Sequence, residues 1–183
     1  MLIGDVQIAA RANVWPGCVL RGDQGAIVIG AETSIQDGTV AHCTGGMSTT
    51  VIGERCTVGH RVILHGCIVE DDCLIGMGAI LNPGSRVEAQ SLVAAGAVIG
   101  RGVTVGSGQL WGGNPAKKMR NLTAEEKERL HYQASAYVQQ ATKQNHVMEL
   151  GGNLQASDVV AVEEADKEKT NQETTESPMK DRH

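Results

Sequence analysis

Aliphatic residues recur every six positions along most of the chain. Short insertions interrupt this step, which then resumes in a new register. The recurring positions are Ile8, Val14 and Leu20; Ile29, Ile35 and Ala41; Ile52, Val58 and Leu64; and Val69, Ile75, Leu81, Val87, Val93, Ile99, Val105 and Trp111. Six is not a helical period, and glycine and β-branched residues are frequent in the repeats. The pattern therefore predicts short β-strands rather than a helix.

A fixed period of six is typical of a β-solenoid. Each hexapeptide supplies one short strand and one corner, and three of them close a coil of about 18 residues. The aliphatic positions of successive coils then stack and fill the interior. We therefore predict an all-β solenoid, a parallel β-helix, over residues 1–115, ended by the break at Asn114 and Pro115.

The pattern changes after residue 115. Thr123 and Glu126 have the spacing of a capping box, in which each side chain satisfies an amide at the start of a helix. An apolar stripe with helical spacing follows, formed by Leu130, Ala134, Tyr137 and Ala141. We expect a C-terminal α-helix within residues 116–150 that packs on the flank of the β-helix or of a neighbouring subunit.

Residues 151–183 have no aromatic residue and no sustained periodicity. They carry eight acidic and four basic residues, which is four of the five net negative charges of the chain. This composition predicts an acidic disordered tail. The chain has no basic patch interleaved with aromatic residues, which argues against nucleic acid as a partner.

Composition agrees with a narrow solenoid interior, because the chain has no phenylalanine and only two tyrosines and two tryptophans. The five cysteines lie within the repeats. An odd number in such positions predicts small buried residues with free thiols in a reducing compartment. The chain has no run of 18 apolar residues, so no transmembrane segment is predicted, and no targeting segment is visible at Met1.

Three of the six histidines lie inside the repeats, within one stretch of 24 residues: His42, His60 and His65. The interior of a β-solenoid does not require histidine, and neutral imidazole is the commonest protein ligand for a zinc-like metal. Solvent-facing histidines without a metal are the alternative. Cys43 and Cys67 lie close to two of them in sequence. However, neighbouring side chains on a strand point to opposite faces, which makes thiolate ligands the weaker hypothesis.

The spacing of the three histidines predicts a divided site. His60 and His65 lie in consecutive strands and so project from different faces of a coil. His42 and His65 are 23 residues apart, which is one coil plus the extra residues of the loop 44–50, so they can stack on one face. If all three bind one ion, His60 must come from a neighbouring subunit. A trimer with a site in each cleft satisfies this, and three ligands with an open position suit a catalytic zinc.

Residues 3–145 resemble the γ-class carbonic anhydrases and their relatives. The motifs that carry the resemblance are Arg21-Gly22-Asp23, Ile35-Gln36-Asp37-Gly38, His42, Val58-Gly59-His60, Leu64-His65-Gly66, Ile75-Gly76-Met77-Gly78, Trp111-Gly112-Gly113-Asn114-Pro115-Ala116 and Leu122-Thr123-Ala124-Glu125-Glu126. The resemblance implies a left-handed β-helix homotrimer with zinc, or iron or cobalt, at the subunit interface. It places His42 and His65 on one subunit and His60 on the next.

The implied activity is hydration of carbon dioxide to bicarbonate. A metal ion lowers the pKa of its bound water until hydroxide forms near neutral pH, an effect for which carbonic anhydrases are the standard example. By resemblance, Gln36 orients or activates this hydroxide, and Arg21 and Asp23 form an ion pair across the subunit interface. Asp37, beside Gln36, is expected to hold that network in place.

The chain departs from the best-studied archaeal members in the residues used for proton export. Gln24 replaces a glutamate, and the loop with a second glutamate is missing, so slow or absent turnover is expected. A tyrosine near the site in relatives corresponds to Tyr132 or Tyr137. Relatives also begin about one coil earlier, whereas this sequence opens within a repeat, which a truncated N-terminus would explain.

Two other functions stay open. Relatives in plants and many protists form a heterotrimer on the matrix side of the membrane arm of mitochondrial respiratory complex I, so a catalytically weak or inactive structural subunit is one alternative. That resemblance suggests the mitochondrial matrix side, whereas a bacterial protein would be cytoplasmic. A hexapeptide acyltransferase using acetyl-coenzyme A is the remote alternative, because such enzymes need one histidine as general base rather than three with ligand spacing.

Overall fold

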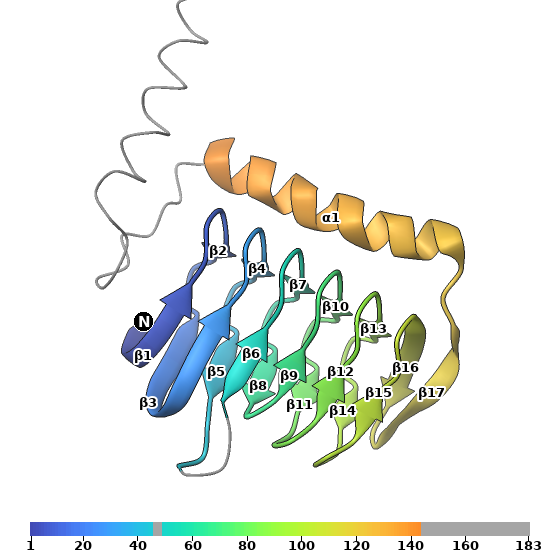
Figure 1. Ribbon diagram of the computed structural model, residues 1–183, viewed down its shortest axis with the longest axis horizontal. Helices are drawn as coiled ribbons and strands as arrows, with labels where there is room; N and C mark the ends of the chain where they lie inside the picture. The colour runs from blue at the N-terminus through green and yellow to red at the C-terminus, as the bar shows by residue number, and fades with distance from the viewer. Residues whose placement is uncertain (46–48, 144–183) are drawn as a thin grey trace, which may run out of the picture. The chain divides into compact units, whose positions relative to one another are not determined.

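The computed structural model describes residues 1–45 and 49–143 (Figure 1). The strands are β1 (Leu2–Ile8), β2 (Asn13–Val14), β3 (Val19–Ile29), β4 (Ser34–Ile35), β5 (Val40–His42), β6 (Thr50–Ile52), β7 (Thr57–Val58), β8 (Ile63–His65), β9 (Ile68–Val69), β10 (Leu74–Ile75), β11 (Ile80–Leu81), β12 (Arg86–Val87), β13 (Leu92–Val93), β14 (Val98–Ile99), β15 (Thr104–Val105), β16 (Gln109–Gly113) and β17 (Ala116–Asn121). One helix follows, α1 (Ala124–Lys143). The tail predicted for residues 151–183 lies outside the described residues.

The strands form a left-handed parallel β-helix with three faces, as predicted. The first face contains the start of β3 with β5, β8, β11 and β14, and the second contains the end of β3 with β6, β9, β12 and β15. The third face is a separate sheet in the order β16, β13, β10, β7, β4 and β2. Figure 1 shows these strands repeating coil after coil. Equivalent residues of successive coils therefore form columns along each face.

The interior is filled by the aliphatic positions that the period of six predicted. Every one of them from Val14 to Val105 is buried, whereas Ile8 and Trp111 lie half-buried at the two ends. All five cysteines are also buried and have free thiols. Small and branched side chains fill the narrow coil without leaving room for rings, which accounts for the scarcity of aromatic residues.

All three corners between faces repeat a positive φ; in the corner from the first face to the second, the residues are Gly66, Gly84 and Gly102. In the glycine corner, where the chain passes from the third face to the first, the residues are Gly17, Gly38, Arg61, Gly78 and Gly96. In the charged corner, where it passes from the second face to the third, they are Arg11, Glu32, Arg55, Asp72, Gln90 and Gly108. A residue with a side chain is disfavoured in this left-handed region, and an interaction of that side chain can offset the cost.

The four charged members of the charged corner form ion pairs between neighbouring coils. Arg11 pairs with Glu32 on the next coil. Arg55 binds both carboxylate oxygens of Asp72, at 2.9 and 3.1 Å, and His131 of α1 lies 3.1 Å from the same carboxylate. Burial opposes ionisation of Asp72, but the hydrogen bonds from Arg55 and His131 outweigh it and lower its pKa. This corner thus attaches the helix to the solenoid.

The chain does not pass from Pro115 directly into the helix. It turns back at a cis Asn114–Pro115 bond, and β17 pairs antiparallel with β16 at the end of the third face. The helix then begins at Ala124 and contacts β2, β4 and β7. Leu130 and Ala134, from the predicted apolar stripe, are buried there. In the part of the chain that the structure describes, no helix is both long and apolar enough to span a membrane.

The predicted capping box is confirmed. The Thr123 amide donates to Glu126 Oε2 at 2.9 Å, and the Glu126 amide donates to Thr123 Oγ1 at 3.2 Å. Arg120 of β17 also binds both oxygens of Glu126, at 2.7 and 2.8 Å. The Arg120 guanidinium and the Thr123 amide together lower the pKa of Glu126 to about 2.

We expect Arg120→Ala to raise the pKa of Glu126 towards the ordinary glutamate value of about 4.3. A carboxylate whose pKa is lowered by folding stabilises the fold above its unfolded pKa, and the contribution is lost as the pH falls through the folded value. Acid fraying of the start of α1 should therefore move to higher pH in the variant. An NMR titration of the Glu126 carboxyl carbon measures the shift, with Lys118→Ala as a control on the same strand. An unchanged pKa in Arg120→Ala would contradict this assignment.

Candidate metal centre

His42 and His65 lie in one outward-facing column of the first face. Arg21 of β3 pairs in register with His42 of β5, which pairs with His65 of β8. The two imidazole rings stack with centroids 5.6 Å apart and an angle of 20° between their planes. The spacing of 23 residues therefore places the two histidines one coil apart on one face, as the sequence predicted.

Polar groups surround the Nε2 atoms of both histidines. Arg21 Nη2 lies 2.8 Å from His42 Nε2 and Asp23 Oδ1 lies 3.4 Å from it. Because a guanidinium can only donate, His42 Nε2 must present its lone pair to Arg21. That lone pair is the one a metal ion requires. Thr44 Oγ1 lies 2.9 Å from His65 Nε2. Sequence reasoning missed Thr44, because it lies after the end of β5, where the insertion interrupts the repeat.

Arg21 and Asp23 lie close to each other within one chain. Arg21 Nε is 3.3 Å from Asp23 Oδ1, and both side chains are substantially exposed. The resemblance implied an ion pair between subunits instead. An exposed pair of this kind contributes little stability by itself, so both side chains are free to exchange partners when another surface approaches.

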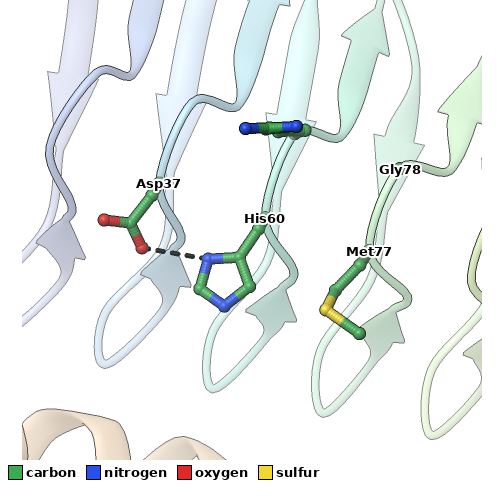
Figure 2. A pocket seen from close by; sticks show the side chains of 5 residues that line it. Asp37, His60, Met77 and Gly78 are labelled. Atoms are coloured by element: carbon green, nitrogen blue, oxygen red, sulfur yellow. Dashed lines mark hydrogen bonds and ion pairs between the residues drawn. The ribbon is translucent and has the colours of Figure 1, made fainter.

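His60 lies on a different part of the coil, in the glycine corner that follows β7. Its Nδ1 is 2.9 Å from Asp37 Oδ2, one coil earlier in the same corner (Figure 2). A carboxylate that accepts a hydrogen bond from Nδ1 fixes the tautomer in which Nε2 carries the lone pair, and this arrangement orients histidine ligands in metal sites. Asp37 therefore acts on His60 directly, a contact that the sequence did not predict.

An open pocket of about 520 Å³ lies beside His60. It is lined by Asp37, His60, Arg61, Met77 and Gly78. Figure 2 shows the imidazole of His60 between the side chains of Asp37 and Met77. Met77, one coil further on, is 56% exposed.

A single chain does not bring the three histidines together. Among residues 1–45 and 49–143, no group of three histidine, cysteine or acidic side chains lies where one ion could be bound. The stacked pair lies on the first face and His60 on the corner before it. The groups nevertheless suit a zinc-like ion, since they are partly or fully exposed imidazoles and, for His60, a carboxylate contacts the ring from behind.

The neighbouring cysteines face inward. Cys43 and Cys67 are fully buried, whereas His42 and His65, each near one of them in sequence, are partly exposed on the outside. Burial raises the pKa of Cys67 to about 12, so its thiol stays protonated. Only a thiolate is a good metal ligand, which leaves the imidazoles as the candidate donors on this face.

Gln36 is buried at the end of β4, directly before Asp37. Its backbone amide donates to the Val58 carbonyl at 2.9 Å and thereby anchors the start of the glycine corner. Tyr137 of α1 packs edge-on against Trp15 with ring centroids 6.4 Å apart, and Tyr132 is 72% exposed. Among the described residues, no hydrogen bond joins either tyrosine or the Gln36 side chain to the three histidines.

Comparison with known proteins finds many relatives, although no protein-family model matches the chain. One is "Gamma carbonic anhydrase 3, mitochondrial" of Arabidopsis thaliana, which is 51% identical over 158 residues, 84% of this chain and 60% of that protein. Another is "Protein YrdA" of Escherichia coli, 43% identical over 144 residues, 75% of this chain and 78% of that protein. The chain spans only 47% to 60% of the plant relatives that it matches.

Among solved structures, a hexapeptide transferase family protein from Anaplasma phagocytophilum is similar in both sequence and fold. It is 42% identical, with a TM-score of 0.75 over 78% of this chain and 83% of that one.

Proposed function

Because the chain belongs to the γ-carbonic anhydrase family of hexapeptide-repeat proteins, we propose that it is a metal-dependent carbonic anhydrase with a site at each interface of a trimer. The observation that carries this proposal is the divided set of donors. His42 and His65 stack on one face, while His60 projects from a corner with Asp37 behind it. In a trimer the face of one subunit and the corner of the next would meet.

The surface beside the histidine column supports assembly. An aliphatic column runs next to it on the first face, formed by Val19, Val40, Ile63, Ile80 and Val98. Ile63 in this column is 37% exposed, and Met77 of the corner is 56% exposed. Burying these side chains against another subunit would add hydrophobic stabilisation at the same place where the donors need a partner. The trimer is either homomeric or formed with related subunits.

The residues of this site would each have a definite task. His42 and His65 of one subunit and His60 of the next would hold a zinc, iron or cobalt ion, which supplies a nucleophile for carbon dioxide by lowering the pKa of bound water. Asp37 would keep the His60 lone pair on Nε2. Arg21 and Asp23 would fix the orientation of His42, and Gln36 would hold the strand end that carries Asp37.

The proposal is tested by the hydration of carbon dioxide. We expect the purified protein to accelerate the reaction in stopped-flow measurements, to lose this activity on treatment with a chelator, and to recover it when zinc, iron or cobalt is restored. Light scattering in parallel should give the mass of a trimer. A metal-loaded trimer without detectable hydration activity would refute the enzymatic function.

A structural subunit of mitochondrial respiratory complex I is the second candidate. It is favoured by Gln24, whose amide cannot export protons as the carboxylate of archaeal members does, and by the mitochondrial name of the plant relatives. That function would place the protein on the matrix side of the inner membrane. Co-purification with the membrane arm of complex I, by a chain that does not hydrate carbon dioxide, would establish it.

A further inference from the structure

Among the five positive-φ residues of the glycine corner, Arg61 is the only one that has a side chain. The other four members are glycines with φ between 68° and 76°, and Arg61 adopts 57° at the equivalent position. Its backbone makes the bond that the corner needs, since its amide donates to the Asp37 carbonyl at 2.9 Å. Glycine would make the same bond without the steric penalty of the left-handed region, so the backbone gives no reason for an arginine here.

The charged corner shows what usually accompanies a charged residue in this conformation. There Arg11 and Arg55 have positive φ, and each is held by a carboxylate of another coil, Glu32 or Asp72. Arg61 differs from both. Within the part of the chain that the structure describes, no hydrogen bond or ion pair engages its guanidinium, and the neighbouring Asp37 binds His60 instead, through Oδ2.

The surroundings of Arg61 are shaped to receive its side chain. It lines the pocket beside His60, and it is exposed. Gly38 occupies the equivalent position one coil earlier, where an added Cβ would come within 3.3 Å of Arg61 Cγ. The glycine therefore leaves room for the arginine to extend over the preceding coil. A cation without a partner is thus held in a pocket next to a candidate metal ligand.

We propose that Arg61 forms a binding site for a small planar oxyanion, and that in this protein the anion is bicarbonate. The guanidinium offers two parallel N–H groups that match two oxygens of a carboxylate-like anion, and it stays charged at all physiological pH values. Bicarbonate has this geometry and charge. The proposal rests on the proposed function for the identity of the anion, but the site itself depends only on the pocket and its unpaired cation.

Arg61→Gly tests this site, because glycine is the residue that the rest of the corner carries. We expect the variant to remain a folded trimer and to bind bicarbonate at least about tenfold more weakly, since a charge-assisted pair of hydrogen bonds is lost. Binding is measured on the metal-free protein by calorimetry and by line broadening of ¹³C-bicarbonate. In the loaded protein, KM for bicarbonate in the dehydration direction should rise more than kcat falls. Arg61→Lys should bind with intermediate affinity.

The matched control is Gln90→Gly. Gln90 has φ of 58° and lies in the charged corner, so its replacement also relieves backbone strain, but away from the pocket. Bicarbonate affinity should be unchanged in this control. Equal affinity in Arg61→Gly and the native protein would overturn the proposal, as would dissociation of the Arg61→Gly trimer, which would identify Arg61 as an interface residue. Arginine-dependent bicarbonate binding by a protein that does not hydrate carbon dioxide would keep this site and refute the enzymatic function alone.

Discussion

His60→Ala is expected to remove the metal while leaving the solenoid folded. The imidazole projects from a corner and is not part of the packed interior, so its loss should leave the free energy of unfolding nearly unchanged. Removing a residue that hydrogen-bonds to a metal ligand lowers metal affinity about 10- to 100-fold. Removing the ligand itself should therefore lower the affinity by more than about 100-fold. Metal content by mass spectrometry and hydration of carbon dioxide should both fall accordingly.

His131→Ala is the matched control, because it removes a histidine of the helix that contacts Asp72 and none of the three candidate ligands. Its metal content should equal that of the native protein. If His60→Ala kept its metal as well, His60 would not be a ligand and the divided site would be wrong.

A mixture of two defective chains separates a divided site from one within a single chain. Co-expression of His60→Ala with the double variant His42→Ala and His65→Ala should restore metal, because some clefts then combine an intact face with an intact corner. Random assembly of cyclic trimers gives such a combination in about one quarter of the clefts. Differently tagged chains allow mixed trimers to be isolated, and mixed trimers without metal would refute the divided site.

Ile75→Ala should have the largest effect on stability. Ile75 is fully buried in the third face and stacks between Val58 and Val93 of the adjacent coils. A rigid narrow interior cannot collapse around the missing atoms, so the variant should lose about 2 to 5 kcal/mol of unfolding free energy. Denaturant unfolding followed by circular dichroism measures the loss.

Ile68→Ala provides the matched comparison, because Ile68 is also an isoleucine of a two-residue strand but is 37% exposed. We expect a loss of about 1 kcal/mol or less. Alternate residues of a strand face opposite sides, so a change of one position decides whether the side chain is inside or outside. Similar losses in the two variants would show that the assigned register is wrong.

Much of the fold follows from the sequence because the repeat is a strong physical signal. Each coil buries one aliphatic residue on each of its three faces, and the adjacent coils bury theirs at the equivalent positions. Positions such as Val58 and Ile75 can therefore be found by counting in steps of six. The β17 strand could not be found in this way. Its sequence, from Ala116 to Asn121, is mostly polar and almost fully exposed, and only pairing with β16 makes it a strand.

The candidate site was predictable in its plan but not in its supporting contacts. Counting places His42 over His65 because columns repeat with the coil. The bond between Asp37 and His60 joins residues 23 positions apart across a corner, and neither the period of six nor composition contains that information. The same holds for Arg61, whose significance appears only when its corner is compared across coils.

The placement of the two tryptophans determines what fluorescence can report about this solenoid. Trp15 lies near the first coils, against Tyr137 of the helix, and Trp111 lies in β16 at the other end of the third face. The coils between them contain no tryptophan. In a solenoid each coil is stabilised by its neighbours, so the terminal coils are the first to open. Intrinsic tryptophan emission therefore follows the fraying ends, whereas the coils that carry the histidines do not contribute to it and need circular dichroism or hydrogen exchange to be observed.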